Sequence, residues 1–105
     1  MALSDICQVA KIGLVLINGE YEVSEVNPYF SSQQGLERAE VLGQKLTHAF
    51  PQSSQVLIHL AGEVFNTGQA VHNAEIEMKV PSIPGFKRVW LCTFFPVVKA
   101  QKKFV

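Results

Sequence analysis

The stretch Val26-Asn27-Pro28-Tyr29-Phe30 marks the point at which the chain changes from strand to helix. The residues before it, 21–26, supply spaced apolar side chains for a strand. Pro28 cannot donate a backbone N–H to a sheet, so the strand ends there. Beyond it, residues 28–46 contain short helical pieces that are punctuated by Gly35 and Gly43.

Upstream of this stretch, the run 13–17 is dense in β-branched and aliphatic residues, which favours a buried strand. Asn18-Gly19 follows it and predicts a type I′ hairpin with positive φ at both residues. The first residues, 3–10, predict a short amphipathic helix whose apolar stripe contains Leu3, Ile6, Cys7 and Ala10.

Downstream, Pro51 and the serines at 53 and 54 predict the start of a longer helix that Gly68 terminates. Its apolar face holds Leu57, Leu60, Ala61 and Val64. Residues 72–80 alternate between apolar and polar, which is typical of a half-buried strand. Residues 88–98 are apolar on both faces and predict one long strand, with Trp90, Cys92 and Phe94 on the same side.

Strands at both ends of the chain and helices in its middle predict an α+β fold, in which helices cover one face of an antiparallel sheet. The 105 residues fit a single domain, and 48% of them are hydrophobic. The formal net charge is zero, which argues against nucleic-acid binding by this segment. No apolar run is long enough to cross a membrane. Two separated cysteines without a redox or metal motif predict free thiols and a cytoplasmic location.

Several short motifs, in their order and spacing, resemble the PAS family of signalling domains. Residues 26–30 are similar to the family's strand-to-helix junction, in which Val-Asn-Pro-x-Phe is common. Residues 35–46, GLERAEVLGQKL, match the family pattern Gly-Tyr-Ser-x-x-Glu followed by two hydrophobic residues and Gly-x-x-Leu, without an insertion. Residues 67–71, TGQAV, resemble the segment before the third strand, and Pro96 lies where the fourth strand usually carries proline.

The resemblance implies a five-stranded antiparallel sheet whose fifth strand lies in the middle, between the first and the fourth. We therefore expect an N-terminal helix at 1–10, a core at 11–98 and the start of the fifth strand, or a tail, at 99–105. The chain stops at Val105, where that strand should begin. We expect a truncated piece of a longer protein with its own output domain; the alternative is that a neighbouring chain supplies the pairing.

The family's cofactors fit the residues poorly. Haem-binding relatives use a histidine near the longer helix, but His59 lies on the polar face, beside Glu63. The photoactive flavin branch needs a cysteine in an Asn-Cys-Arg-Phe-Leu motif, and the corresponding region here has none. Glu75 and Glu77 share one strand face that is best interpreted as solvated. We predict no haem, flavin–cysteine adduct or metal site, and no catalytic residues.

An apolar cavity between the longer helix and the sheet is the predicted ligand site, because this is where ligands bind in the family. An unidentified small molecule would contact residues of the helix and of the last two long strands: Leu57, Leu60, Ala61, Val64, His72, Ile76, Met78, Trp90, Cys92 and Phe94. A plain packed core is the alternative. A buried Trp90 would need a partner for its indole N–H and could act as a polar handle for the ligand.

Two functions follow from the resemblance. The first is a signal-sensing domain of a sensor kinase, transcriptional regulator or cyclic-dinucleotide enzyme, which binds a small ligand in the cavity. The second is a ligand-free homodimerisation module that uses Leu3, Ile6 and Ala10 together with the outer sheet face. Neither function makes the chain an enzyme.

Overall fold

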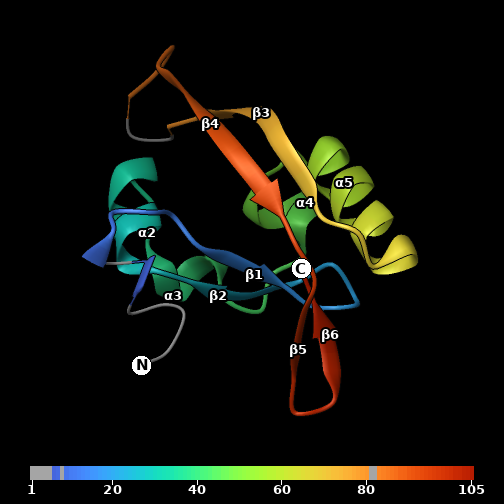
Figure 1. Cartoon of the computed structure of the whole chain (residues 1–105). Coiled ribbons are helices and arrows are strands. Elements are labelled where there is room, and N and C mark those ends of the chain that lie inside the picture. The colour runs from blue at the N-terminus through green and yellow to red at the C-terminus, as the bar shows by residue number, and fades with distance from the viewer. Residues whose placement is uncertain (1–5, 8, 81–82) are drawn as a thin grey trace.

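The computed structural model describes residues 6, 7, 9–80 and 83–105. Within this part of the chain, strands come first, helices follow and strands return, so the predicted α+β class is confirmed (Figure 1). The elements are β1 (Val15–Ile17), β2 (Val23–Val26), α2 (Pro28–Gln34), α3 (Arg38–Val41), α4 (Leu46–Ala49), α5 (Ser54–Thr67), β3 (Val71–Lys79), β4 (Lys87–Phe94), β5 (Val97–Lys99) and β6 (Lys102–Phe104).

The described strands form three antiparallel pairs, β1–β2, β3–β4 and β5–β6. The long strand predicted at 88–98 is divided, because β4 ends at Phe94 and β5 begins at Val97. Pro96 lies between them and lacks the N–H that a continuous ladder needs. Residues 99–105, expected to be the start of the fifth strand or a tail, contain β6, which forms a projecting hairpin with β5 (Figure 1). At its end, Val105 exchanges two backbone hydrogen bonds with Ile17 of β1, at 2.7 and 2.9 Å.

The turn between β1 and β2 differs from the predicted type I′ turn. The N–H of Tyr21 donates to the carbonyl oxygen of Asn18 at 3.0 Å, so Gly19 and Glu20 occupy the two central positions. The positive φ falls at Tyr21, not at Gly19. The side-chain oxygen of Asn18 accepts the N–H groups of Glu20 and Glu22, both at 3.0 Å. These hydrogen bonds of Asn18 favour a turn that is followed by a residue in the left-handed conformation, here Tyr21. After the two-residue loop, this is the next most common type of hairpin connection.

The start of α2 is fixed by Asn27, which is fully buried. Its side-chain oxygen accepts the N–H of Phe30 at 3.0 Å and the N–H of Leu14 at 2.9 Å. Its amide nitrogen donates to the carbonyl oxygen of Ile12 at 2.7 Å. Asn27 is therefore both the N-cap of the helix and the link between that helix and the chain entering β1.

The short helix α3 is attached to β2 through Arg38. Its guanidinium binds the carboxylate of Glu25 and donates to the carbonyl oxygen of Val26 at 2.9 Å. Burial opposes ionisation of Glu25, but hydrogen bonds from Arg38 and from the N–H of Val26 outweigh it and lower the pKa of the carboxyl.

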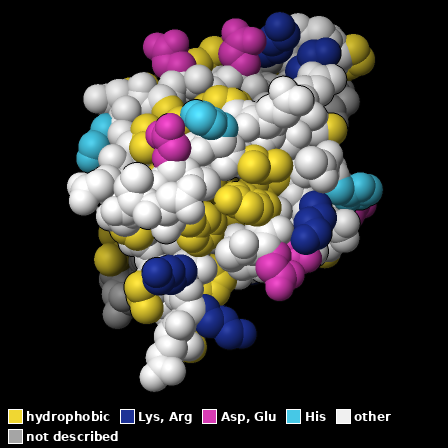
Figure 2. All heavy atoms as spheres, turned by 90° about the vertical axis from the view of Figure 1, so that its right-hand side faces the viewer, with side chains coloured by type: hydrophobic (Ala, Val, Ile, Leu, Met, Phe, Trp, Pro, Cys, Tyr) yellow, Lys and Arg dark blue, Asp and Glu magenta, His cyan; other side chains and the backbone are white. Residues whose placement is uncertain are grey.

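The longer helix α5 starts and ends as predicted, with Gly68 in the left-handed conformation at its C-terminus. Leu57, Ala61 and Val64 are buried in one cluster with residues of β1–β4, among them Ile76 and Phe94. Figure 2 views the molecule from the α5 side: hydrophobic side chains gather in the middle of this face, and charged side chains lie mostly toward its edges.

The N-terminal segment is described only in part, and Leu3 lies outside the described residues. The N–H of Ala10 donates to the carbonyl oxygen of Ile6 at 3.0 Å, which is helical bonding. Cys7 is buried, whereas Ile6 is 49% exposed and Ala10 is also exposed. The side of this segment that contacts the domain is therefore that of Cys7, and the predicted interface residues Ile6 and Ala10 are exposed.

Candidate apolar cavity

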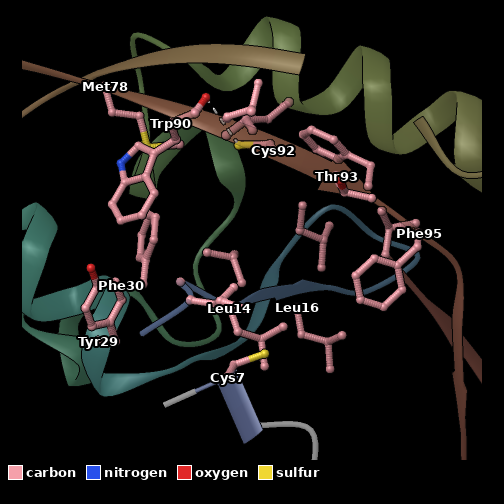
Figure 3. Close-up of a pocket in the computed structure, with 18 of the residues that line it drawn as sticks. Cys7, Leu14, Leu16, Tyr29, Phe30, Met78, Trp90, Cys92, Thr93 and Phe95 are labelled. Atoms are coloured by element: carbon pink, nitrogen blue, oxygen red, sulfur yellow. Dashed lines mark hydrogen bonds between the residues drawn. The ribbon is translucent and has the colours of Figure 1, made fainter. Parts of the chain in front are cut away.

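An apolar cavity of about 450 Å³ lies between β1 and β4, with α2 at one end and the β5–β6 hairpin at the other. Figure 3 shows Trp90 and Cys92 of β4 on one side of the cavity, and Leu16 of β1 with Leu14, which precedes β1, on the other. Five of the residues predicted to line the ligand site do line this cavity: Leu57, Met78, Trp90, Cys92 and Phe94.

The other predicted residues lie elsewhere. Ala61, Val64 and Ile76 are buried but belong to the packed core outside this cavity, and Leu60 is only half-buried. His72 is exposed. The β3–β4 register shifts between Val71 and Ala74, which breaks the alternation that placed His72 on the inner face.

Trp90 is held by a partly buried polar contact with Gln34. Its indole N–H donates to the side-chain oxygen of Gln34 at 2.8 Å, and the amide nitrogen of Gln34 donates to the carbonyl oxygen of Lys79 at 2.8 Å. Gln34 is 1% exposed and thus joins α2 to both β3 and β4. The indole N–H already has its partner, so Trp90 offers a ring face, and not the predicted polar handle, to a ligand.

Aromatic residues that the sequence reasoning did not select complete the wall. Phe30 lies 4.9 Å from Trp90 between ring centroids, and Phe50 lies 6.1 Å from Phe30 at nearly a right angle. Gly13 lies beside this group: a Cβ on it would come within 2.9 Å of Phe30 and 3.1 Å of Trp90. Phe30 and Gln34 are four residues apart on α2, a spacing that could have indicated their shared inner face.

Among the described residues that line the cavity, Lys11 is the one that carries a charge. Burial raises the pKa of the Cys92 thiol, which stays protonated near neutral pH. Among the described residues, no group of three or more His, Cys, Asp or Glu could hold a metal ion. His59 is exposed and lies 3.3 Å from Glu63, as its place on the polar face of α5 predicted.

These features define an α+β module built around an apolar cavity between its sheet strands and helices. A family model described as PAS fold matches residues 9–105. The chain belongs to the PAS family, a family of sensory modules. No curated protein matches the chain.

Solved structures share the fold at low sequence identity. The PAS domain of the nitrogen regulation protein NR(II) from Vibrio parahaemolyticus has a TM-score of 0.73 and 12% identity, covering 99% of this chain and 93% of that one. A domain of an HTR-like protein from Haloarcula marismortui ATCC 43049 has a TM-score of 0.68 and 17% identity, covering 88% and 89%. An RNA-binding light-oxygen-voltage receptor has a TM-score of 0.67 and 18% identity, covering 97% and 31%.

None of the helices in the described ranges is both long enough and apolar enough to span a membrane.

Proposed function

We propose that this PAS domain senses a signal within a larger cytoplasmic signal-transduction protein by binding one small, neutral, apolar ligand. The larger protein would be a sensor kinase, a transcriptional regulator or a cyclic-dinucleotide enzyme. The observation that carries the proposal is the 450 Å³ cavity, whose walls are mostly apolar. Its size is within the range of small-molecule sites in proteins.

The ligand class follows from the groups that face the cavity. The ring faces of Trp90 and Phe30 and the thioether of Met78 favour an aromatic or aliphatic molecule. The neutral thiol of Cys92 offers only a weak hydrogen bond. A charged ligand would lose its hydration without gaining a partner of opposite charge on the β4 side, which is unfavourable.

Ligand binding could act on the rest of the protein because the cavity is bounded by separate elements. Its walls come from β1, β4 and α2, and Val105 lies at its hairpin end. A ligand that fits one packing of these elements better than another shifts the equilibrium between them by its difference in affinity. This mode of action requires no turnover, and we propose that the domain itself catalyses nothing.

The first test is native mass spectrometry of the protein purified from its host, followed by titration of the emptied protein with indole as an apolar probe. We expect a retained small molecule and saturable binding of indole. Cys92→Phe should weaken indole binding at least tenfold because the new ring fills the cavity. Val89→Phe is the matched control, since Val89 is 58% exposed on the opposite face of β4. An empty protein that binds no indole would contradict the proposal.

A ligand-free homodimerisation module is the second candidate. It is favoured by the apolar side chains on the outer face of β4, where Val89 and Leu91 are 58% and 68% exposed. Val9 and Ile12 add 80% and 53% exposed side chains near the N-terminus. Large exposed apolar side chains that gather on one surface favour association. If the protein is an empty dimer in sedimentation experiments, and Leu3→Glu with Ile6→Glu dissociates it, this second function is supported over the first.

A further inference from the structure

The dipeptide Asn18-Gly19 lies in the turn between β1 and β2 and has no role in either function considered above. Asn18 is half-buried, and Gly19 is exposed. The backbone nitrogen of a residue that follows asparagine can attack the asparagine side-chain amide, because both groups are held in one chain and the product is a small ring. Glycine has no Cβ to obstruct this attack. The turn therefore contains both partners of an intramolecular reaction.

The structure holds the side-chain amide of Asn18 at both of its polar atoms. Its oxygen accepts the backbone N–H groups of Glu20 and Glu22, both at 3.0 Å. Its nitrogen donates to a carboxylate oxygen of Glu22, also at 3.0 Å. When a nucleophile adds to the amide carbon, negative charge develops on the oxygen. The two N–H groups already lie where they stabilise that charge.

The nitrogen of Gly19 is free to react. Within the described part of the chain, its N–H has no hydrogen-bond partner. The turn is closed instead by the N–H of Tyr21, which donates to the carbonyl oxygen of Asn18 at 3.0 Å. Apart from the chain neighbours of Gly19, no described residue lies within 4 Å of the position that a Cβ on it would take. Solvent therefore reaches this side of the turn.

We propose that Asn18 is a site of spontaneous deamidation in the folded domain, with the backbone nitrogen of Gly19 as the nucleophile. Hydroxide removes the amide proton of Gly19, the nitrogen bonds to Cγ of Asn18, and the Cγ–Nδ2 bond breaks. Nδ2 takes a proton from water, which regenerates hydroxide, and leaves as ammonia. The product is a cyclic imide. Water then opens the imide at either carbonyl group, which gives aspartate or isoaspartate at position 18.

Both products disturb the turn. Aspartate places a carboxylate where the amide of Asn18 donated to Glu22, so two negative charges face each other. Lys45 lies 3.7 Å from the other oxygen of Glu22 and is 57% exposed, so it offsets the repulsion only in part. In isoaspartate the main chain runs through Cβ, and the former carbonyl that accepts the N–H of Tyr21 becomes a free carboxylate. Since Ile17 lines the cavity, the modification loosens β1 at the cavity wall.

The test is incubation of the folded protein at mildly alkaline pH, followed by mass spectrometry of tryptic peptides, with a sample at time zero to correct for reaction during digestion. Replacement of NH by O should occur at Asn18 at least about tenfold faster than at Asn66 or Asn73, which precede residues with a Cβ. Asn27 lies in the same peptide, 12–38, and is an internal reference, because Pro28 has no N–H to attack its amide.

Gly19→Ala is the matched control for the nucleophile. The φ angle of Gly19 is not positive and its surroundings leave room for a Cβ, so alanine fits the turn. Its methyl group hinders the attack, and the rate at Asn18 should fall at least about tenfold.

The effect of the aspartate product is measured by thermal unfolding of Asn18→Asp. The variant should melt roughly 5 °C lower than the wild type, because the new carboxylate faces Glu22. In a Glu22→Gln background the same change should lower the melting temperature by less than half as much. Equal losses in the two backgrounds would contradict the effect given to this product.

Three results would overturn the proposed site itself. The first is a rate at Asn18 no greater than at Asn66 or Asn73. The second is an unchanged rate in Gly19→Ala, which would exclude the Gly19 nitrogen as the nucleophile. The third is deamidation in the urea-unfolded chain alone, which would show that the folded turn protects Asn18. None of these measurements involves a ligand, so their outcome is independent of the proposed ligand function.

Discussion

Replacing Gln34 by leucine tests how the cavity wall is held in place. The change keeps the volume of the side chain in α2 but removes both of its hydrogen bonds, one from the Trp90 indole and one to the Lys79 carbonyl oxygen. The indole N–H, half-buried beside Phe30, is left without a partner. Because Trp90 is the one tryptophan in the chain, its fluorescence also reports on this site.

The magnitude can be worked from these two contacts. An orphaned, partly buried donor costs about 2 kcal/mol, and the lost bond to Lys79 costs about 1 kcal/mol. Gln34→Leu should therefore lower the free energy of unfolding by about 3 kcal/mol, and the melting temperature by roughly 10–20 °C. In a Trp90→Phe background there is no indole N–H to orphan, so the same change should cost only about 1 kcal/mol. The expected coupling between the two positions is about 2 kcal/mol.

The assay is urea denaturation followed by far-ultraviolet circular dichroism, which does not depend on tryptophan. It compares the wild type, both single variants and the double variant. Gln55→Leu is the matched control, because Gln55 is exposed on α5 and the change should stay within about 0.5 kcal/mol. Equal costs of Gln34→Leu in the two backgrounds, within about 0.5 kcal/mol, would refute the role given to the Gln34–Trp90 bond.

Three further predictions concern other parts of the fold. Asn27→Ala should destabilise the domain by about 2–4 kcal/mol in the same assay, because it removes a helix cap and leaves buried backbone groups without partners. Asn66 is exposed, and the control variant Asn66→Ala should cost under about 0.5 kcal/mol. The pKa of Glu25 is lowered in the folded protein, so its contact with Arg38 stabilises the fold above the unfolded pKa, which is near 4.5. This stabilisation is lost as the pH falls through the folded pKa. In the Glu25→Gln variant, the free energy of unfolding should therefore change less over this pH range. Cys92 has a raised pKa, so its alkylation by iodoacetamide at pH 8 should be slower in the folded than in the urea-unfolded protein, and equal rates would contradict its burial.

The sequence predicted those features that depend on local signals. Gly68 ended α5 where expected because glycine alone adopts the left-handed cap without strain. Pro28 opened α2 after the predicted strand. The apolar face of α5 predicted which side packs on the sheet, and His59 was correctly placed on the other.

Features set by tertiary contacts could not be predicted in this way. A bulge near Asn73, where φ is positive, moves His72 off the inner face of β3. No pattern of residues in the sequence predicts this bulge. Gln34 is polar in sequence but fully buried, because two partners distant in the chain satisfy its amide. The cavity depends on how β1 and β4 are placed, and the residues that line it from these two strands are more than 70 positions apart in the chain.

The most direct test of the ligand proposal is a nuclear Overhauser spectrum of the methyl-labelled chain saturated with indole. The proposed site predicts contacts from the indole protons to the Met78 methyl group and to Leu57, which line the cavity, and none to Val89 on the outer face. Saturable binding with contacts to Val89, and none to Met78 or Leu57, would contradict the assignment of this cavity as the ligand site.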